Sequence, residues 1–257
     1  MQGAVIKTYF AHKKHIDPEK IISVAVTPCT AKKAEIAREE LCDAGKLLNI
    51  EEMRDNDYVI TTKELVQWCK EEGMDLEKIT PSKYDSVLGE GTGAGMIFGN
   101  TGGVMEAALR TAYYLLKGEN PPADAFQAVR STGFNEHRGV QEAVFQVDDV
   151  TVRTAAVSGL GNARALIDKI ERGEVQYDFV EVMACPGGCV GGGGQPIHEG
   201  EELAFERGKN LYYLDMNADI RYSHENPDVQ KLYEEYFEKP NSHKSHMLLH
   251  TEHMKNK

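Results

Sequence analysis

The sequence has 257 residues, enough chain to bury a substantial hydrophobic core in one large domain or two smaller ones. Its 41% hydrophobic and 27% charged residues are typical of soluble globular proteins, and 41 acidic against 29 basic residues give a formal net charge of −12. This charge argues against nucleic acids and anionic membrane surfaces as partners. No apolar run approaches the length of a membrane span and no signal peptide is visible, so we expect a cytoplasmic protein.

Strands and helices are predicted to alternate in the first part of the chain. Ile21–Pro28 is a continuous β-branched run typical of a strand buried on both faces, and Ala31–Leu41 after it has helical character. Tyr58–Thr61 predicts a second strand, followed by a helix that opens near Thr62 and ends before Gly73.

The same alternation continues toward the C-terminus. Val152–Val157 predicts a third strand, and a helix follows it with one apolar face made of Ala163, Leu166, Ile167 and Ile170. Tyr177–Cys185 predicts a fourth strand. The pattern indicates an α/β fold with largely parallel sheet, in which ligands gather at the carboxyl ends of strands. Near the end of the chain, Asn226 and Pro227 predict the start of a helix with one apolar stripe.

Cysteines and glycines are unevenly placed. The five cysteines are an odd number for a disulfide framework, and reduced thiols or metal ligands are the better interpretation. Of the 24 glycines, 13 fall within Gly89–Gly103 and Pro186–Gly194, and such clusters mark tight turns or a close approach of backbone to a ligand. Neither stretch has the ending of a phosphate-binding Walker loop.

Cysteines beside glycines favour an iron–sulfur cluster, because thiolates bind the irons and backbone amides donate hydrogen bonds to the sulfides. Cys185 and Cys189 can place two sulfurs on one cluster, and Cys29 can supply a third from the end of another strand. The alternatives are buried apolar cysteines and a zinc site, although a spacing of three residues between cysteines departs from that of zinc knuckles. Cys42 and Cys69 are interpreted as structural thiols.

Two of these segments closely resemble signature motifs of the iron-only (FeFe) hydrogenases: VTPCTAKKAE at Val26–Glu35 and FVEVMACPGGCVGGGGQP at Phe179–Pro196. Gly89–Arg110 resembles the segment between those motifs, and Tyr222–Phe237 with the HMLLHT ending resembles the family's small-subunit-type tail. The resemblance implies residues 1–198 as the C-terminal part of the catalytic domain and 199–257 as a helical tail. It also implies a two-lobed α/β fold with an iron–sulfur cluster in the cleft between largely parallel sheets.

The resemblance further implies an H-cluster, a 4Fe-4S cluster bridged by a cysteine to a diiron subsite with CO and CN ligands. Cys29 and Cys185 would bind the four-iron cluster, and Cys189 would bridge to the diiron unit. Lys32 would donate a charged hydrogen bond to a cyanide ligand. Positions that line the cluster cavity in the family match Phe98, Gly99 and Met183, which could equally be plain core residues.

Two departures from the family are visible. The Thr-Ser-Cys-Cys-Pro signature that supplies the fourth cluster cysteine has no counterpart in the 257 residues, and Thr27 stands where methionine is common. We therefore interpret the chain as a fragment of a longer protein or one chain of a split enzyme, in which a partner supplies the missing cysteine motif.

The implied function is the reversible reduction of protons to H2, with an electron carrier such as ferredoxin and the hydrogenase maturation proteins as partners. The first alternative is an electron-transfer or cluster-assembly protein related to hydrogenases but without H2 chemistry, and the second is a pure interaction module. His246 and His250, four residues apart, could bind a metal, but a packed or solvated tail is favoured for the histidines at residues 243–253.

Overall fold

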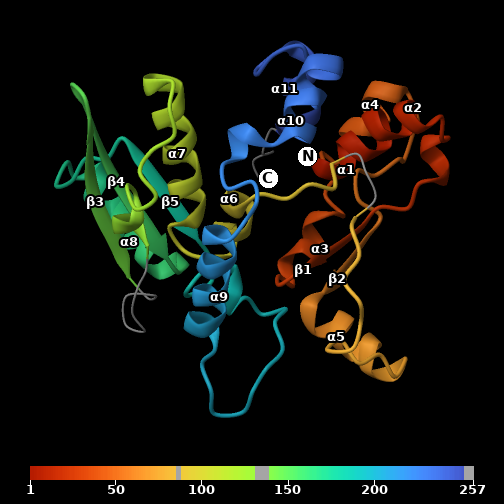
Figure 1. The fold of residues 1–257 in the computed structure, drawn as a ribbon, viewed down its shortest axis with the longest axis horizontal. Helices are drawn as coiled ribbons and strands as arrows, with labels where there is room; N and C mark the ends of the chain where they lie inside the picture. Colours follow the sequence, from red (N-terminus) through yellow and green to blue (C-terminus); the bar gives the residue numbers. More distant parts are fainter. Residues whose placement is uncertain (85–87, 131–138, 252–257) are drawn as a thin grey trace. The chain divides into compact units, whose positions relative to one another are not determined.

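The computed structural model describes residues 1–84, 88–130 and 139–251, and the chain divides into two compact units (Figure 1). Unit 1 comprises Met1–Glu90 and Pro227–Lys257, and unit 2 comprises Gly91–Asn226. Each unit contains a small sheet with helices packed beside it, which confirms the predicted α/β class. Within the described ranges, no helix is long and apolar enough to cross a bilayer.

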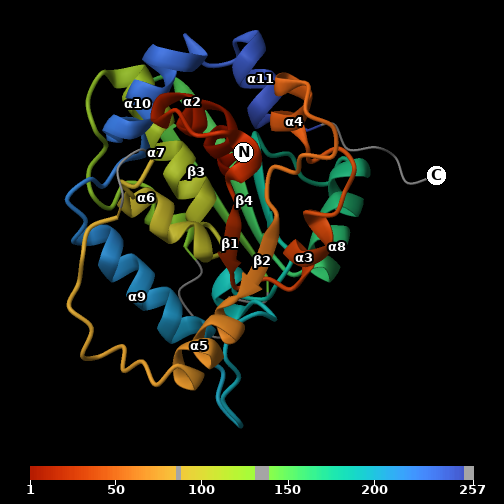
Figure 2. The same cartoon turned by 90° about the vertical axis from the view of Figure 1, so that its right-hand side faces the viewer.

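The sheet of unit 1 has two parallel strands, β1 (Val24–Thr27) and β2 (Tyr58–Thr61), which lie side by side in Figure 2. β2 has the predicted bounds, and the helix α5 (Thr62–Glu71) follows it directly, as expected. Thr61 and Glu64 form a capping box, in which each side chain accepts the other's backbone N–H. This reciprocal pairing satisfies amides that the first helical turn leaves open, so strand passes into helix without a loop.

Strand β1 departs from its prediction in burial. Its side chains at Val24 and Val26 are 49% and 50% exposed, so the expectation of a strand buried on both faces is wrong. They share one face of the strand because side chains alternate with a period of two. A β-branched run predicts a strand but cannot report how many faces are covered. The helix predicted after it is also shorter, since α3 covers only Ala31–Glu35.

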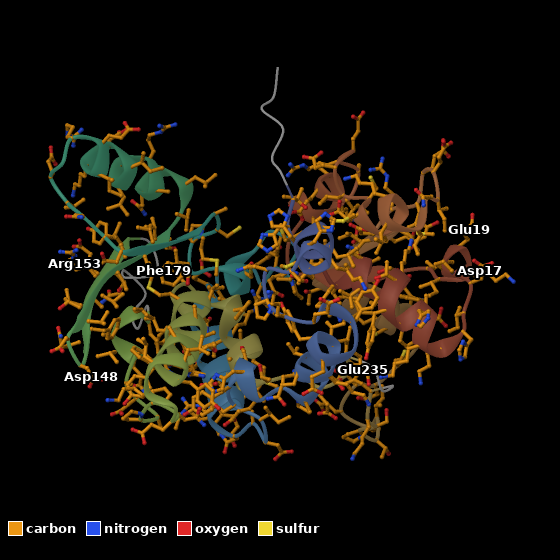
Figure 3. The ribbon with its side chains drawn as sticks, turned by 90° about the horizontal axis from the view of Figure 1, so that it is seen from above. Asp17, Glu19, Asp148, Arg153, Phe179 and Glu235 are labelled. Carbon is orange, nitrogen blue, oxygen red and sulfur yellow. The ribbon has the colours of Figure 1, made fainter. Side chains whose placement is uncertain are left out.

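Helices from both ends of the chain build the core of unit 1. They contribute Val5, Tyr9, Leu232, Phe237 and Leu248 to one apolar cluster. Glu235, labelled in Figure 3, accepts a hydrogen bond from the Tyr9 hydroxyl at 2.7 Å and so ties the two ends together. Besides α3 and α5, the helical elements described in unit 1 are α1 (Gln2–Val5), η1 (Ile6–Phe10), α2 (Ala11–Lys14), η2 (Pro18–Lys20), α4 (Asp43–Leu48), α10 (Pro227–Leu232), η8 (Tyr233–Phe237) and α11 (His243–Leu249). The start of α10 at Pro227 is as predicted.

The sheet of unit 2 has the order β3-β4-β5, with β3 (Val140–Val147) antiparallel and β5 (Phe179–Met183) parallel to β4 (Val150–Ser158). Asp148, labelled in Figure 3, lies at the hairpin between β3 and β4. β4 and β5 correspond to predicted strands, whereas β3 was not predicted. Its sequence, VQEAVFQV, mixes polar and apolar residues irregularly, which gives a weaker signal than the continuous apolar run of a buried strand.

Two helices cover opposite faces of this sheet. α7 (Gly103–Lys117) packs through Met105 and Leu109, and α8 (Leu160–Glu171) packs through Ala163 and Leu166. Of the four residues predicted to form the apolar face of α8, Ala163 and Leu166 are buried, whereas Ile167 and Ile170 are exposed. The remaining elements of the unit are α6 (Gly93–Met96), η3 (Ile97–Gly99), η4 (Gln127–Val129), η6 (Cys189–Gly191), α9 (Ala204–Met216) and η7 (Ser223–Glu225).

Candidate functional site

A tight turn after β5 carries two of the predicted ligands, Cys185 and Cys189. The backbone N–H of Gly188 donates to the carbonyl of Cys185 at 3.0 Å. Gly187 and Gly188 have φ values of 81° and 96°, which favour glycine, and the Gly187 N–H donates to the Ser158 hydroxyl at 2.8 Å. Both thiols are partly exposed. The turn therefore presents two sulfurs from a short, internally bonded stretch of backbone.

The second glycine-rich stretch packs directly on this turn. The Thr101 N–H donates to the Gly187 carbonyl at 3.2 Å. A Cβ added to Gly188 would lie 2.7 Å from both the Gly99 carbonyl oxygen and the Thr101 nitrogen, closer than real side chains come. The two glycine clusters, separate in the sequence, are thus one structure in which the loop at residues 99–102 holds the cysteine turn.

Glu181, on β5, holds this loop through hydrogen bonds to backbone amides. Its buried carboxylate accepts the backbone N–H groups of Gly102 at 2.6 Å and Met105 at 2.7 Å, at the start of α7. Burial raises the pKa of Glu181, although these amide donors oppose the shift. The sequence analysis did not single out Glu181, and the available signal was a carboxylate in the middle of an otherwise apolar strand, FVEVM.

A buried ion network lies behind the same loop. Arg110 on α7 bonds Asp215 on α9 through both carboxylate oxygens at 2.7 Å, and it bonds Glu106 at 2.6 Å. Arg130 bonds Glu106 at 2.6 Å, and Arg221 bonds Asp215. Burial alone would raise the pKa of Asp215, but Arg110 and Arg221 hold it below its ordinary value. The network joins α7 and α9 into a scaffold for the loop.

The residues around the turn fit an iron–sulfur cluster chemically. Two thiols share one turn, and glycines let backbone come close where side chains would collide. Within the described ranges, the buried side-chain atoms that lack a hydrogen-bond partner are Asn100 Oδ1, Thr101 Oγ1 and Tyr212 Oη. Two of these belong to the loop that grips the cysteine turn, so unsatisfied polar groups border the predicted cluster ligands.

Cys29 lies in unit 1, between the end of β1 and the start of α3, as predicted. Its backbone N–H donates to the Thr27 hydroxyl at 3.3 Å, and that hydroxyl donates to the Cys29 carbonyl at 3.1 Å. Lys32, predicted to reach a cyanide ligand, is 49% exposed and forms an ion pair with Glu35. Lys33 is 45% exposed and forms an ion pair with Glu64.

The predicted ligands are divided between the two units. Cys185 and Cys189 belong to unit 2 and Cys29 to unit 1. In the described part of the chain, no group of three or more His, Cys, Asp or Glu side chains could hold a metal ion. Of the predicted lining residues, Phe98 is 45% exposed and Met183 is partly buried. The three-cysteine ligand set therefore stays a prediction.

Cys42, Cys69 and the histidines considered in the tail belong to unit 1. The Cys42 thiol donates to the Glu39 carbonyl at 3.1 Å, and a surface pocket of about 770 Å³ beside it contains none of the candidate cluster ligands. The rings of His246 and His250 stack with centroids 4.6 Å apart on unit 1. The neighbouring Leu248 is buried in the core, which agrees with a packed tail. His253 lies outside the described residues.

Comparisons with known proteins cover nearly the whole chain. Residues 1–193 match the family described as "Iron only hydrogenase large subunit, C-terminal domain", and residues 201–256 match "Iron hydrogenase small subunit". The NADP-reducing hydrogenase subunit HndD of Solidesulfovibrio fructosivorans is 45% identical over 256 residues, covering 99% of this chain and 42% of that protein. Cytosolic iron-sulfur assembly component 3 of Bos taurus is 31% identical over 258 residues, covering 98% of this chain and 51% of that protein.

The fold matches solved structures as well. A structure of HydA(deltaEFG), whose description concerns stepwise assembly of the [FeFe]-hydrogenase H-cluster, aligns with a TM-score of 0.75 at 38% identity. The match covers 97% of this chain and 67% of that one. The chain spans about half the length of the two curated relatives.

Proposed function

Because this chain belongs to the iron-only hydrogenase family, we propose that it forms part of a hydrogenase catalytic domain that interconverts protons, electrons and H2. Cys29 and Cys185 would bind the four-iron cluster, and Cys189 would bind it while bridging to the diiron subsite. When bound, this H-cluster would supply the iron site at which H2 is formed or split, and it would pass electrons from or to the electron carrier.

The observation that carries the proposal is the turn at Cys185–Cys189 and the loop that grips it. Thr101 and Gly188 are packed so closely that the turn has no room for a side chain, and Glu181 fixes the loop to β5. Outer-shell hydrogen bonds orient the ligands of a metal site, and two hydrogen bonds at Gly187 fix the backbone between Cys185 and Cys189.

We also propose that Lys32 donates a charged hydrogen bond to a cyanide ligand of the diiron subsite. In the structure its ammonium faces the Glu35 carboxylate at the surface of unit 1. An exposed ion pair of this kind contributes little to stability, so the ammonium can exchange Glu35 for another anion at low cost. The Lys32→Gln variant should therefore fold normally and lose activity.

Hydrogen evolution tests the proposal. The complete protein that contains this chain would be produced with the hydrogenase maturation proteins and assayed for H2 from reduced viologen. We expect activity in the unaltered protein and in Cys69→Ala, and loss of activity in Cys189→Ala. Full activity in Cys189→Ala would contradict the proposed role of that thiolate. We further propose a cytoplasmic location and an electron carrier such as ferredoxin.

A cluster-assembly or electron-transfer protein without H2 chemistry is the second candidate. The similarity to cytosolic iron-sulfur assembly component 3 of Bos taurus, which extends over 98% of this chain, favours it. That protein is less similar to this chain than HndD is, at 31% against 45% identity. Bound iron and sulfide without H2 evolution, in the presence of the maturation proteins, would support this second function over the first.

A further inference from the structure

The two faces of the β1–β2 sheet in unit 1 are covered unequally (Figure 2). Val24, Val26 and Tyr58 share one face, because the register pairs Val24 with Tyr58 and side chains alternate along each strand. On this open face, the exposed fractions of the three side chains are 49%, 50% and 60% in that order. The opposite face includes Val59, which is buried. Three large apolar side chains are thus left half-open to solvent on one side of a regular sheet.

The sheet is also small and has no core of its own. Among the described residues, neither β1 nor β2 pairs with a third strand, and the apolar cluster of unit 1 includes no residue of either strand. Parallel sheets are normally covered on both faces, and stable sheets usually have three or more strands or a helix packed on their apolar face. A free strand edge is a ready template for another strand. The sheet therefore has the properties of one part of a larger sheet.

Polypeptide that could complete the sheet exists in the relatives. The match to HndD covers 99% of this chain but only 42% of that protein, so more than half of HndD lies outside the match. The aligned structure of HydA(deltaEFG) also extends beyond its match, which covers 67% of it. Parallel strands are joined by crossover connections, usually helices, so a segment that adds a parallel strand also brings a helix able to cover a face.

We propose that the open face and the free edge of β1 form the docking surface for a strand-and-helix segment from outside residues 1–257. The segment adds a strand parallel to β1, and its apolar side chains cover Val24, Val26 and Tyr58. It belongs either to the rest of the complete protein or to a partner chain of a split enzyme.

The direction of β1 decides what this segment brings to the site. Parallel strands end at the same edge of a sheet, and β1 ends at Thr27, two residues before Cys29. Neighbouring strands lie about 4.8 Å apart, so the chain that leaves the added strand passes beside Cys29. A cysteine at that point can supply the thiolate that the 257 residues lack. This last step rests on the proposed function, whereas the docking itself does not.

Photo-crosslinking in the metal-free complete protein, purified with any partner chain, identifies the occupant. Photo-reactive benzoylphenylalanine would replace Val26, and in a control it would replace Val150 on β4, whose exposed fraction of 46% is close to that of Val26. We expect position 26, but not position 150, to crosslink to a peptide from outside residues 1–257. A crosslink from position 26 to residues 1–257 of the same chain or of a second copy, or the absence of any crosslink, would overturn the proposal.

A charge on the open face gives an independent test. In the complete protein, Val26→Lys should lower the urea midpoint of unfolding, because the docked segment would bury an unpaired ammonium. Val150→Lys introduces the same charge on a strand of unit 2 and should leave the midpoint unchanged. Equal midpoints in the two variants would show that Val26 stays in water, and the docking would be refuted. Neither test measures iron or H2, so this failure would leave the proposed function standing, and a protein without iron would not refute the docking.

Discussion

Replacement of Gly188 by alanine tests whether the cysteine turn is gripped as described. Gly188 has φ 96° and ψ −161°, a conformation that residues with a Cβ rarely adopt, and such strain costs about 1–3 kcal/mol. The new Cβ would also lie 2.7 Å from Gly99 O and Thr101 N, and overpacking of a tight site costs about 1–3 kcal/mol more. Both neighbours are backbone atoms, which cannot rotate aside. We expect Gly188→Ala to lower the free energy of unfolding by about 4 kcal/mol in total.

Urea denaturation followed by circular dichroism measures this loss, with Gly161→Ala as the control. Gly161 lies in α8, and a Cβ there would meet nothing within 4 Å. Alanine is the better helix former, and Gly161 lies in the first turn, so the control should lose no stability and gain at most about 1 kcal/mol. The reasoning would be refuted if Gly188→Ala unfolded within about 0.5 kcal/mol of the unaltered protein, which is the scatter expected of a neutral substitution.

Three further substitutions probe the two units. Arg110→Met would strip the buried Asp215 carboxylate of its shortest hydrogen bonds and should cost about 3–5 kcal/mol in urea denaturation; a loss below about 1 kcal/mol would contradict a buried network. The Lys33 ammonium, the Thr61 N–H and the Thr61 hydroxyl lower the pKa of Glu64 from 4.5 to about 2. The stability that Glu64 adds is therefore present above pH 4.5 and lost as pH falls toward 2. Glu64→Gln should flatten that part of a pH–stability profile, and an unchanged profile would disprove the assignment. Leu248→Ala should lower the free energy of unfolding by about 2–5 kcal/mol, because it leaves a cavity in the core of unit 1. Thermal melting measures this loss, and a smaller loss would contradict the placement of Leu248 in that core.

The sequence predicted best those features that depend on short-range patterns. The sequence predicted that the helix after β2 opens near Thr62, and the structure starts α5 there with Thr61 as its cap. β-branched runs locate the strands that end before Cys29 and Cys185. Local preferences decide such elements, because the signal lies within a few residues. The spacing of Cys185 and Cys189 likewise predicted a shared turn, which the structure contains.

Features that depend on distant residues were not predictable in the same way. Glu181 acts on amides at Gly102 and Met105, far away in the sequence, and nothing near Glu181 indicates those partners. The exposure of one face of β1 was missed for the same reason, because distant residues decide what covers a strand and side-chain type alone does not reveal it. The ion pair of Lys32 with Glu35 was within reach of the sequence, because residues three apart on a helix are neighbours.

The central claim is that Cys29, Cys185 and Cys189 bind an iron–sulfur cluster, and iron and acid-labile sulfide analysis tests it most directly. The complete protein that contains this chain would be purified anaerobically and compared with variants carrying alanine at each of the five cysteines. For the cluster held by these thiols, we predict about four irons and four sulfides in the unaltered protein and in the Cys42 and Cys69 variants, with loss in the other three. Iron content that is absent, or that is indifferent to Cys29, Cys185 and Cys189, would contradict the account.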